Sequence, residues 1–198
     1  MNKVVKEGLT ERQIALKLER FVKSNGAEFS FSPIIASSPN SCHPHARVTD
    51  RVLRNNENVL LDFGIDINGY KSDLTRNFFL GRIAPRVKQV FDALTLAQRE
   101  AISLIKPGIP CSQIDNQARK VLRKFGLAKY FGHSLGHGVG LDIHEGPRLS
   151  SQSKSILEAG MIVTVEPGVY IPNQFGIRVE DMVLVTKEGC EVLSGYYN

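Results

Sequence analysis

The chain carries one helical segment twice. Residues 6–26, KEGLTERQIALKLERFVKSNG, align without a gap with residues 106–126, KPGIPCSQIDNQARKVLRKFG, and share Lys6/Lys106, Gly8/Gly108, Gln13/Gln113, Ile14/Ile114 and Gly26/Gly126. Each copy has apolar residues at helical spacing between a capping residue, Thr10 or Ser112, and a glycine that predicts the end of the helix. Chance similarity of two amphipathic helices is the alternative, but the glycines at both ends argue against it. We therefore expect two related halves.

The strands predicted after these helices repeat as well. NVLLDFG (58–64) resembles MIVTVEPG (161–168), and YKSDLTRNFFL (70–80) resembles GIRVEDMVLVT (176–186). Acidic residues occupy matching positions in the two halves, Asp62 with Glu166 and Asp73 with Glu180. These patterns predict a duplicated α+β unit that carries two carboxylates in each copy.

A further helix is predicted before the second copy only. The segment RVKQVFDALTLAQREAISLI (86–105) has an apolar stripe made of Val87, Val90, Phe91, Leu94, Ala97, Ala101 and Leu104. Only residues 1–5 precede the first copy. The first half is therefore expected to lack a helix, which leaves apolar sheet surface to be covered by a partner, by a second copy in a homodimer, or by nothing.

The first predicted hairpin brings two carboxylates together. An Asn-Gly pair at 68–69 lies between two apolar runs, which is the strongest short signal for a two-residue hairpin turn. In that register Asp62 lies opposite Thr75, and Asp73 lies opposite Gly64. Asp62 and Asp73 then share one face as diagonal neighbours, with about 7–8 Å between their backbones.

The second hairpin adds two more carboxylates. Its connection, YIPNQFG (170–176), does not fix the register, but any even sum of paired numbers puts Glu166 and Glu180 on one face. Solvent-facing acids are the alternative, although each acid lies within a run of β-forming apolar residues. Four buried carboxylates need protons or cations to compensate their repulsion. With one imidazole, such an oxygen-rich set suits a bridged pair of Mn²⁺, Co²⁺, Fe²⁺ or Zn²⁺ ions, about 3.5–4 Å apart.

A glycine-rich segment, FGHSLGHGVGLDIHEGP (131–147), supplies the imidazoles. His133 and His137 have the four-residue spacing of a helical metal pair, and His144 follows closely. The interspersed glycines make a regular helix improbable here. The residues alone leave open whether the three histidines bind one metal or serve separate roles.

Composition excludes several other classes of protein. The chain of 198 residues, 42% hydrophobic and 23% charged, is sized for one globular domain. Its net charge of +5 is spread along the chain with a local concentration in residues 118–129, where a solvated helix face is a better interpretation than a nucleic-acid site. The 3 cysteines form no C-x-x-C pair, and no apolar stretch approaches the roughly 20 residues of a membrane span. We therefore expect a cytoplasmic protein without nucleic-acid or membrane partners.

Six ordered motifs together resemble a known family. HPHARVTDR, LLDFG, KSDLTRNFFLG, GHSLGHGVGLDIHEGP, TVEPGVYIP and GIRVEDMVLVT are similar to motifs of the pita-bread metallopeptidases (M24-type). Within that family they look most like the proline-specific branch, the Xaa-Pro aminopeptidases and prolidases. The resemblance implies a pseudo-twofold duplicated antiparallel sheet with helices packed on its outer face. It also implies a hydrolase with two divalent metal ions, Mn²⁺ foremost, that cuts the bond between an N-terminal residue and proline in a peptide or dipeptide.

The resemblance assigns the metal ligands. They would be Asp62, Asp73, His137, Glu166 and Glu180, with Asp73 and Glu180 bridging the two ions. Glu166 would also act as a catalytic proton shuttle.

The resemblance also places His45, His133 and His144 at the substrate, with His45 and His144 as catalytic groups. A core histidine is the alternative for His133. Arg178 shares a strand face with Glu180 and would orient the carboxylates at the substrate site, unless it is an exposed hairpin residue. Arg148 would bind the free carboxylate of a dipeptide, or else be an exposed loop residue, so aminopeptidase and dipeptidase both stay open.

Two other groups of the family are alternatives for this chain, and its N-terminal part differs from the usual pattern. Methionine aminopeptidases share the five ligands, whereas non-catalytic relatives that serve as binding or assembly modules typically lose ligands. Members of the proline-specific branch usually carry an N-terminal domain. Here we expect a single catalytic domain over residues 1–198 that lacks that domain and its own first helix, either as a fragment or as a naturally shortened relative.

Overall fold

The computed structural model describes residues 4–195 as two related halves. The first half contains α1 (Glu11–Ser24), β1 (Glu28–Phe29), β2 (Ile34–Ser37), a short 3₁₀ helix η1 (Asn40–Cys42), β3 (Glu57–Asp62), β4 (Ile65–Ile67), β5 (Tyr70–Lys71) and β6 (Thr75–Leu80). The second contains α2 (Pro85–Ile102), α3 (Cys111–Lys124), η2 (Ala128–Tyr130), β7 (Gly136–Gly138), β8 (Glu145–Leu149), β9 (Ile162–Val165), β10 (Gly168–Ile171), β11 (Phe175–Arg178), β12 (Asp181–Val185) and β13 (Cys190–Val192).

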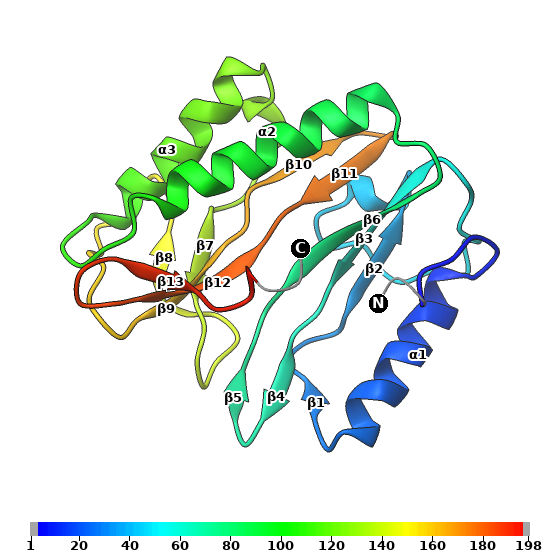
Figure 1. Cartoon of the computed structure of the whole chain (residues 1–198), viewed down its shortest axis with the longest axis horizontal. Helices are drawn as coiled ribbons and strands as arrows, with labels where there is room; N and C mark the ends of the chain where they lie inside the picture. The colour runs from blue at the N-terminus through cyan, green and yellow to red at the C-terminus, as the bar shows by residue number, and fades with distance from the viewer. Residues whose placement is uncertain (1–3, 196–198) are drawn as a thin grey trace.

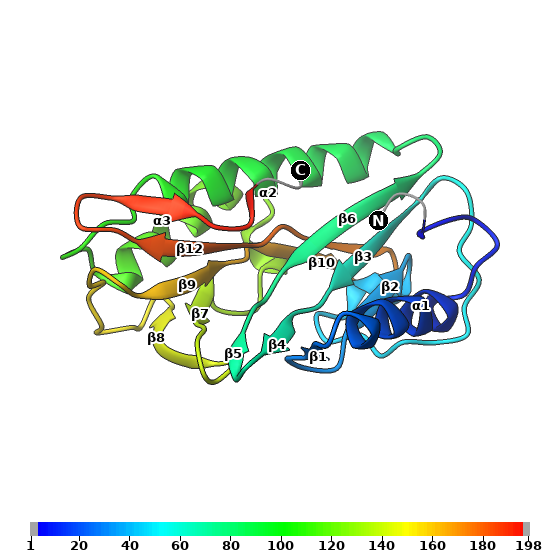
Figure 2. The same ribbon diagram turned by 60° about the horizontal axis from the view of Figure 1, so that its bottom comes forward.

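Antiparallel strands form the body of both halves. The first half has the orders β2-β3-β6 and β1-β4-β5, and the second has β13-β12-β9-β7-β8 and β10-β11. Figure 1 shows the strands of the two halves side by side, with α2 running along β10 and β11. Figure 2 shows α2 and α3 on the second half and α1 on the first. None of the helices described has the length and apolar character that a membrane crossing requires.

The repeated helices begin in the same structural context. Gly8 and Gly108 both have φ +85°, a left-handed conformation that favours glycine. The backbone N–H of Gly8 donates to the carbonyl of Leu53 at 3.0 Å, and that of Gly108 donates to Leu157 at 2.8 Å. An isolated bridge pairs the next segment in each half, Thr10 with Val52 and Pro110 with Ile156. The internal repeat predicted from the sequence is therefore present in three dimensions.

One predicted cap is wrong. Thr10 caps α1 in a reciprocal capping box with Gln13, as expected. Ser112, however, lies inside α3, whose N-cap is Pro110 without a side-chain hydrogen bond. The N–H of Cys111 donates instead to the carbonyl of Ser155 at 3.0 Å. The segment around Ser155 therefore satisfies this donor at the start of α3.

The helices end near the predicted glycines. Gly26 and Gly126 follow the C-caps with φ +72° and +68°. The helix predicted over residues 86–105 begins at Pro85 and ends at Ile102, so Leu104 lies outside it.

The first hairpin has the predicted register, and the second, whose register the sequence left open, has an even sum of paired numbers. Asn68 and Gly69 have positive φ, as a type I′ turn requires, and Asp62 pairs with Thr75. In the second half Val165 pairs with Asp181 and Gly168 with Arg178. The two residue numbers in each of these pairs add up to the same even number, and the numbers of Glu166 and Glu180 do so too. Glu166 therefore lies opposite Glu180.

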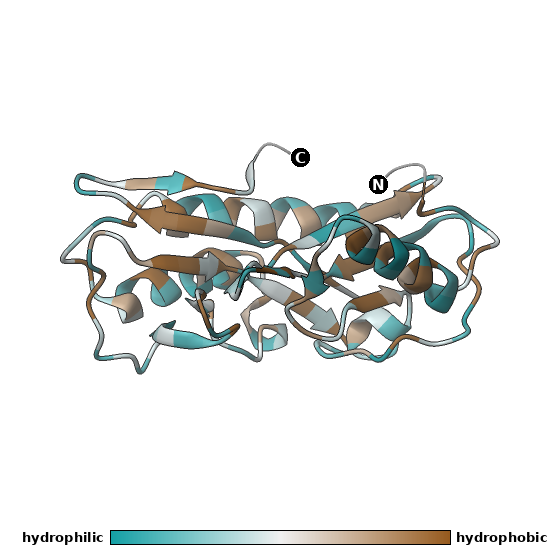
Figure 3. Cartoon of the chain, turned by 90° about the horizontal axis from the view of Figure 1, so that it is seen from below, coloured by the Kyte–Doolittle hydropathy of each residue, from teal (hydrophilic) through white to brown (hydrophobic). Residues whose placement is uncertain are grey.

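The core is unevenly divided. The larger apolar cluster joins α2 and α3 to the strands of the second half and includes Leu94, Ile114, Leu122, Val163 and Ile177. The smaller cluster of the first half includes Ile14, Ile35, Leu53, Val59 and Leu61. Figure 3 shows apolar residues concentrated on the strands, while α1 has both polar and apolar surfaces.

An apolar groove of about 1420 Å³ lies between α1, β6 and α2. Its walls include Leu18 and Phe21 of α1, Phe78 and Leu80 of β6, and Phe91 of α2. Within residues 4–195, α1 has no preceding helix to match α2. The groove is apolar surface of the kind expected where the first half lacks that helix.

Candidate metal centre

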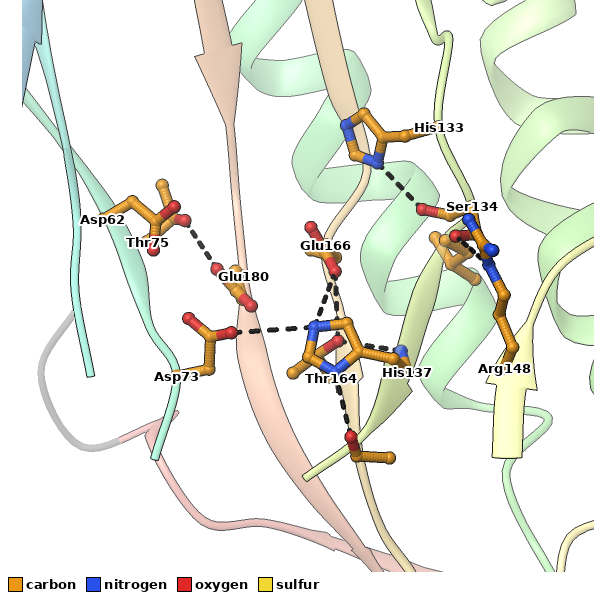
Figure 4. A network of polar contacts seen from close by, with 12 residues as sticks. Asp62, Asp73, Thr75, His133, Ser134, His137, Arg148, Thr164, Glu166 and Glu180 are labelled. Atoms are coloured by element: carbon orange, nitrogen blue, oxygen red, sulfur yellow. Dashed lines mark hydrogen bonds and ion pairs between the residues drawn. The ribbon is translucent and has the colours of Figure 1, made fainter. Parts of the chain in front are cut away.

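Five predicted ligands come from five positions along the chain. Asp62 ends β3, Asp73 lies between β5 and β6, His137 is in β7, Glu166 follows β9, and Glu180 lies between β11 and β12. Figure 4 shows Asp73, His137, Glu166 and Glu180 turned toward one another, with Asp62 beyond Glu180. Strands of both halves therefore supply one site.

The distances within this group suit shared binding of a cation. Nε2 of His137 lies 3.6 Å from Oδ2 of Asp73 and 3.4 Å from Oε1 of Glu166. Ligand atoms of Asp73, His137 and Glu180 all lie within 4.8 Å of one another. Such spacing lets several side chains reach a single ion without backbone movement.

Burial and mutual repulsion disfavour the charged forms of these acids. Burial, with the charges of Asp62 and Glu166, raises the pKa of Asp73 to about 8. Burial is also the main cause that raises the pKa of Glu166 to about 7. The pKa of Glu180 is raised well above its usual value by burial and then by the charge of Asp73. A cation would relieve this repulsion.

An unpaired acceptor is a further indication of a cation site. Oδ1 of Asp62 is buried and has no hydrogen-bond partner among the described residues. A buried acceptor left in this state is costly unless another group satisfies it. The residues present therefore fit a divalent metal, because oxygen donors with excess negative charge surround one imidazole.

His137 presents a lone pair to the acids. Its Nδ1 lies 2.9 Å from the carbonyl of Gly138, which can only accept, so Nδ1 carries the hydrogen and Nε2 is the free acceptor. Burial lowers the pKa of His137 to about 4, which favours the neutral ring that binds metals.

Glycines on both sides allow β7 to approach its neighbours. A Cβ at Gly136 would lie 1.9 Å from the carbonyl oxygen of Thr164, and one at Gly138 would lie 2.2 Å from that of Gly146. The predicted absence of a helix here is confirmed, since residues 136–138 form a strand.

Arg178 connects the acids to the wall of the site. It is only 4% exposed, which excludes the exposed-hairpin alternative. Its Nη2 donates to Asp62, its Nε donates to Thr75 Oγ1 at 3.0 Å, and its Nη1 donates to the Tyr170 hydroxyl at 2.7 Å. The guanidinium thus orients a proposed ligand, as the shared strand face suggested.

Tyr170 and Thr75 were not singled out from the sequence. Both could have been found by strand parity, because Tyr170 shares a face with Glu166 and Thr75 lies opposite Asp62 in the predicted register. The Tyr170 hydroxyl lies 3.1 Å from Nε2 of His133.

His133 lies at one end of this chain of hydrogen bonds. Its Nδ1 donates to the carbonyl of Ser134 at 2.8 Å, so Nε2 accepts from the Tyr170 hydroxyl. Burial lowers the pKa of His133 to about 4. His133 is therefore a neutral ring that points toward Tyr170.

The other predicted substrate residues lie on the exposed side. The ring of His144 is 4.4 Å from that of His137, centroid to centroid. Arg148 pairs with His137 across β7 and β8, and its Nε donates to Ser134 Oγ at 2.9 Å. His45 is exposed, and its neighbour Pro44 accepts a hydrogen bond from Arg178 at 3.2 Å.

Known proteins are similar to this chain in sequence. Residues 1–187 match the profile of Metallopeptidase family M24. An Xaa-Pro dipeptidase of Pyrococcus furiosus is 40% identical over 191 residues, which cover 96% of this chain and 55% of that protein. The chain thus spans about half the length of the curated relatives it matches.

Solved structures are similar over the same region. A prolidase from Pyrococcus furiosus superposes with a TM-score of 0.95 at 39% identity, covering 98% of this chain and 58% of that one. An X-Pro aminopeptidase from Thermotoga maritima has a TM-score of 0.94 at 38% identity, covering 97% and 55%. The pita-bread fold expected from the motifs is confirmed, and with it the resemblance on which the ligand assignment rests. The chain belongs to metallopeptidase family M24.

Proposed function

We propose that this chain is the catalytic region of a metal-dependent exopeptidase that cuts the bond between an N-terminal residue and proline. The observation that carries the proposal is the convergence of buried acids from both halves on the lone pair of His137. The relatives named Xaa-Pro dipeptidase and prolidase supply the substrate class.

The site would hold two divalent ions, with Mn²⁺ preferred over Co²⁺, Zn²⁺ and Fe²⁺. The ligands would be Asp62, Asp73, His137, Glu166 and Glu180. Bound there, the ions would polarise the scissile carbonyl and make a water acidic enough to attack it. Asp73 and Glu180 come from different halves and have ligand atoms within 4.8 Å of each other and of His137, which supports a shared role for both.

The protein groups around the acids would handle the proton and the substrate. Glu166, whose Oε1 lies 3.4 Å from Nε2 of His137, would accept and return a proton beside the bound ions. His144 lies beside His137 on the exposed side, where it would donate to the scissile carbonyl together with His45. His133 would contact the substrate through the edge that its bond to Tyr170 leaves free.

Arg148 favours a dipeptide as the substrate. It is exposed, lies next to His137 across the strand pair, and is fixed through Nε by Ser134. Its terminal nitrogens would pair with the free carboxylate that follows proline in a dipeptide. A tripeptide places that carboxylate one residue farther away.

The test uses the full 198-residue chain, treated with chelator and then supplied with Mn²⁺. We expect cleavage of Ala-Pro only after Mn²⁺ is added, faster than cleavage of Ala-Pro-Ala, and we expect Arg148→Ala to remove that preference. Cleavage of Met-Ala-Ser but not of Ala-Pro would favour a methionine aminopeptidase-like activity. Absence of metal binding and of cleavage would favour a non-catalytic binding module.

A further inference from the structure

The hydroxyl group of Thr75 lies where the two halves meet. Thr75 is the first residue of β6 and is 1% exposed. Its Oγ1 lies 2.5 Å from Oε2 of Glu180 and 3.0 Å from Nε of Arg178, and both partners belong to the other half. Figure 4 shows the contact between Thr75 and Glu180.

The chemistry of the partners sets the direction of both hydrogen bonds. Nε of Arg178 can only donate, so Thr75 accepts with a lone pair. A carboxylate that binds a metal is ionised and can only accept, so in that state the single hydrogen of the hydroxyl is directed at Glu180. The terminal torsion of a glutamate is broad, so its strand alone does not fix the rotation of the carboxylate. The hydrogen bond from Thr75 fixes this rotation.

A second, related contact supports the pairing of the halves. Thr75 lies two residues after Asp73, and Met182 lies two residues after Glu180. The backbone N–H of Asp73 donates to Sδ of Met182 at 3.4 Å. Each half thus contacts a proposed bridging ligand of the other half through the residue two positions after its own ligand.

We infer that Thr75 is a positioning residue that fixes the Glu180 carboxylate for metal binding, an inference that rests on the proposed function. Arg178 extends the effect, because the guanidinium that holds Thr75 also holds Asp62. A ligand of the first half and a ligand of the second are thereby oriented by one connected set of hydrogen bonds.

Two variants separate the hydroxyl from the shape of the side chain. Thr75→Val removes the hydroxyl at nearly constant volume, and Thr75→Ser retains it. Mn²⁺ is titrated by calorimetry into the chelator-treated full chain, and Co²⁺ absorption spectra report the ligand geometry. We expect Thr75→Val to weaken Mn²⁺ binding roughly 10- to 100-fold, as for other groups that orient metal ligands, and to change the Co²⁺ spectrum. Thr75→Ser should restore both.

Thr95→Val is the matched control, because it makes the same exchange at a hydroxyl that donates to the carbonyl of Phe91 within α2 and contacts none of the proposed ligands. We expect it to bind Mn²⁺ like the parent chain. Parent-like Mn²⁺ affinity in Thr75→Val, or equal losses in Thr75→Ser and Thr75→Val, would overturn the inference.

Failure of the proposed function has a different signature. If the parent chain binds neither Mn²⁺ nor Co²⁺, the proposed function fails. Crystal structures of the parent and of Thr75→Val then decide the inference about Thr75. The inference that Thr75 positions Glu180 stands if the Glu180 carboxylate has a different orientation in Thr75→Val than in the parent. It is wrong if the orientation is the same in both structures.

Discussion

In the second half α2 and α3 pack together and form the larger core, whereas in the first half α1 packs alone and an apolar groove stays open. Asp73 of the first half nevertheless lies within reach of His137 and Glu180 of the second. The site therefore depends on the strands, which match between the halves, and much less on the helices, which do not.

The hairpins differ in one respect that shapes the site. Glu166 lies directly opposite Glu180, whereas Asp62 lies opposite Thr75 and Asp73 is displaced along the strand. The displacement leaves room for Thr75 to reach across to Glu180. Duplication explains why strands of both halves surround the site. The different placement of the acids in the two hairpins explains the hydrogen bond between Thr75 and Glu180.

The largest expected effect comes from removing the central carboxylate of the first half. Asp73→Asn should lower kcat/KM for Ala-Pro by more than the roughly 10- to 100-fold typical of groups that only orient ligands, because the ligand itself is lost. Asp66→Asn is the matched control, since Asp66 belongs to the same hairpin but pairs with Lys71 instead. Similar rates for the two variants would contradict a central role for Asp73.

The pH dependence of stability tests whether acids of both halves repel one another. In the metal-free chain the pKa values of Asp73 and Glu166 are raised to about 8 and about 7, so the folded state binds protons that the unfolded state has lost. His133 and His137, whose pKa values are lowered to about 4, act in the opposite sense up to their usual value of 6.5. The free energy of unfolding should therefore fall once pH rises above about 6.5, by about 1.4 kcal/mol per pH unit for each acid that still binds its proton.

Urea denaturation at several pH values, with chelator or with saturating Mn²⁺, measures this dependence. We expect Mn²⁺ to stabilise the chain increasingly as pH rises, and Asp73→Asn to show a shallower slope without metal. A metal-free stability that rises between about pH 6.5 and 8, where the histidines no longer contribute, would refute the assigned repulsion.

The smallest expected effect distinguishes the two repeated helix starts. Thr10→Ala should cost about 1 kcal/mol of the free energy of unfolding, because Thr10 and Gln13 satisfy donors at the start of α1. Ser112→Ala should change it by only a few tenths of a kcal/mol, since Ser112 is not a cap. Thermal or urea unfolding of both variants gives the comparison. Equal losses in the free energy of unfolding would support the prediction that Ser112 caps its helix as Thr10 does.

Periodicity and turn chemistry were enough to predict the strand pairing from the sequence. The Asn-Gly turn set the register that pairs Asp62 with Thr75. Strand parity placed Glu166 and Glu180 on one face, and the structure adds the register that puts them opposite each other. Ser112 was misassigned because Ser155, distant in sequence, satisfies the start of α3. Strand parity is enough to place Tyr170 and Thr75 on the face of the site, but not to predict their hydrogen bonds, which depend on the direction of the Arg178 side chain.

The close approach of β7 also has a consequence for engineering. Gly136 and Gly138 leave no space for a side chain, so the depth of position 137 is set by backbone contacts with Thr164 and Gly146. Replacing His137 by a carboxylate or a thiol would present the new donor from an unchanged backbone. The two glycines beside position 137 are therefore closed to substitution, because any side chain there would push the imidazole of His137 away from the acids.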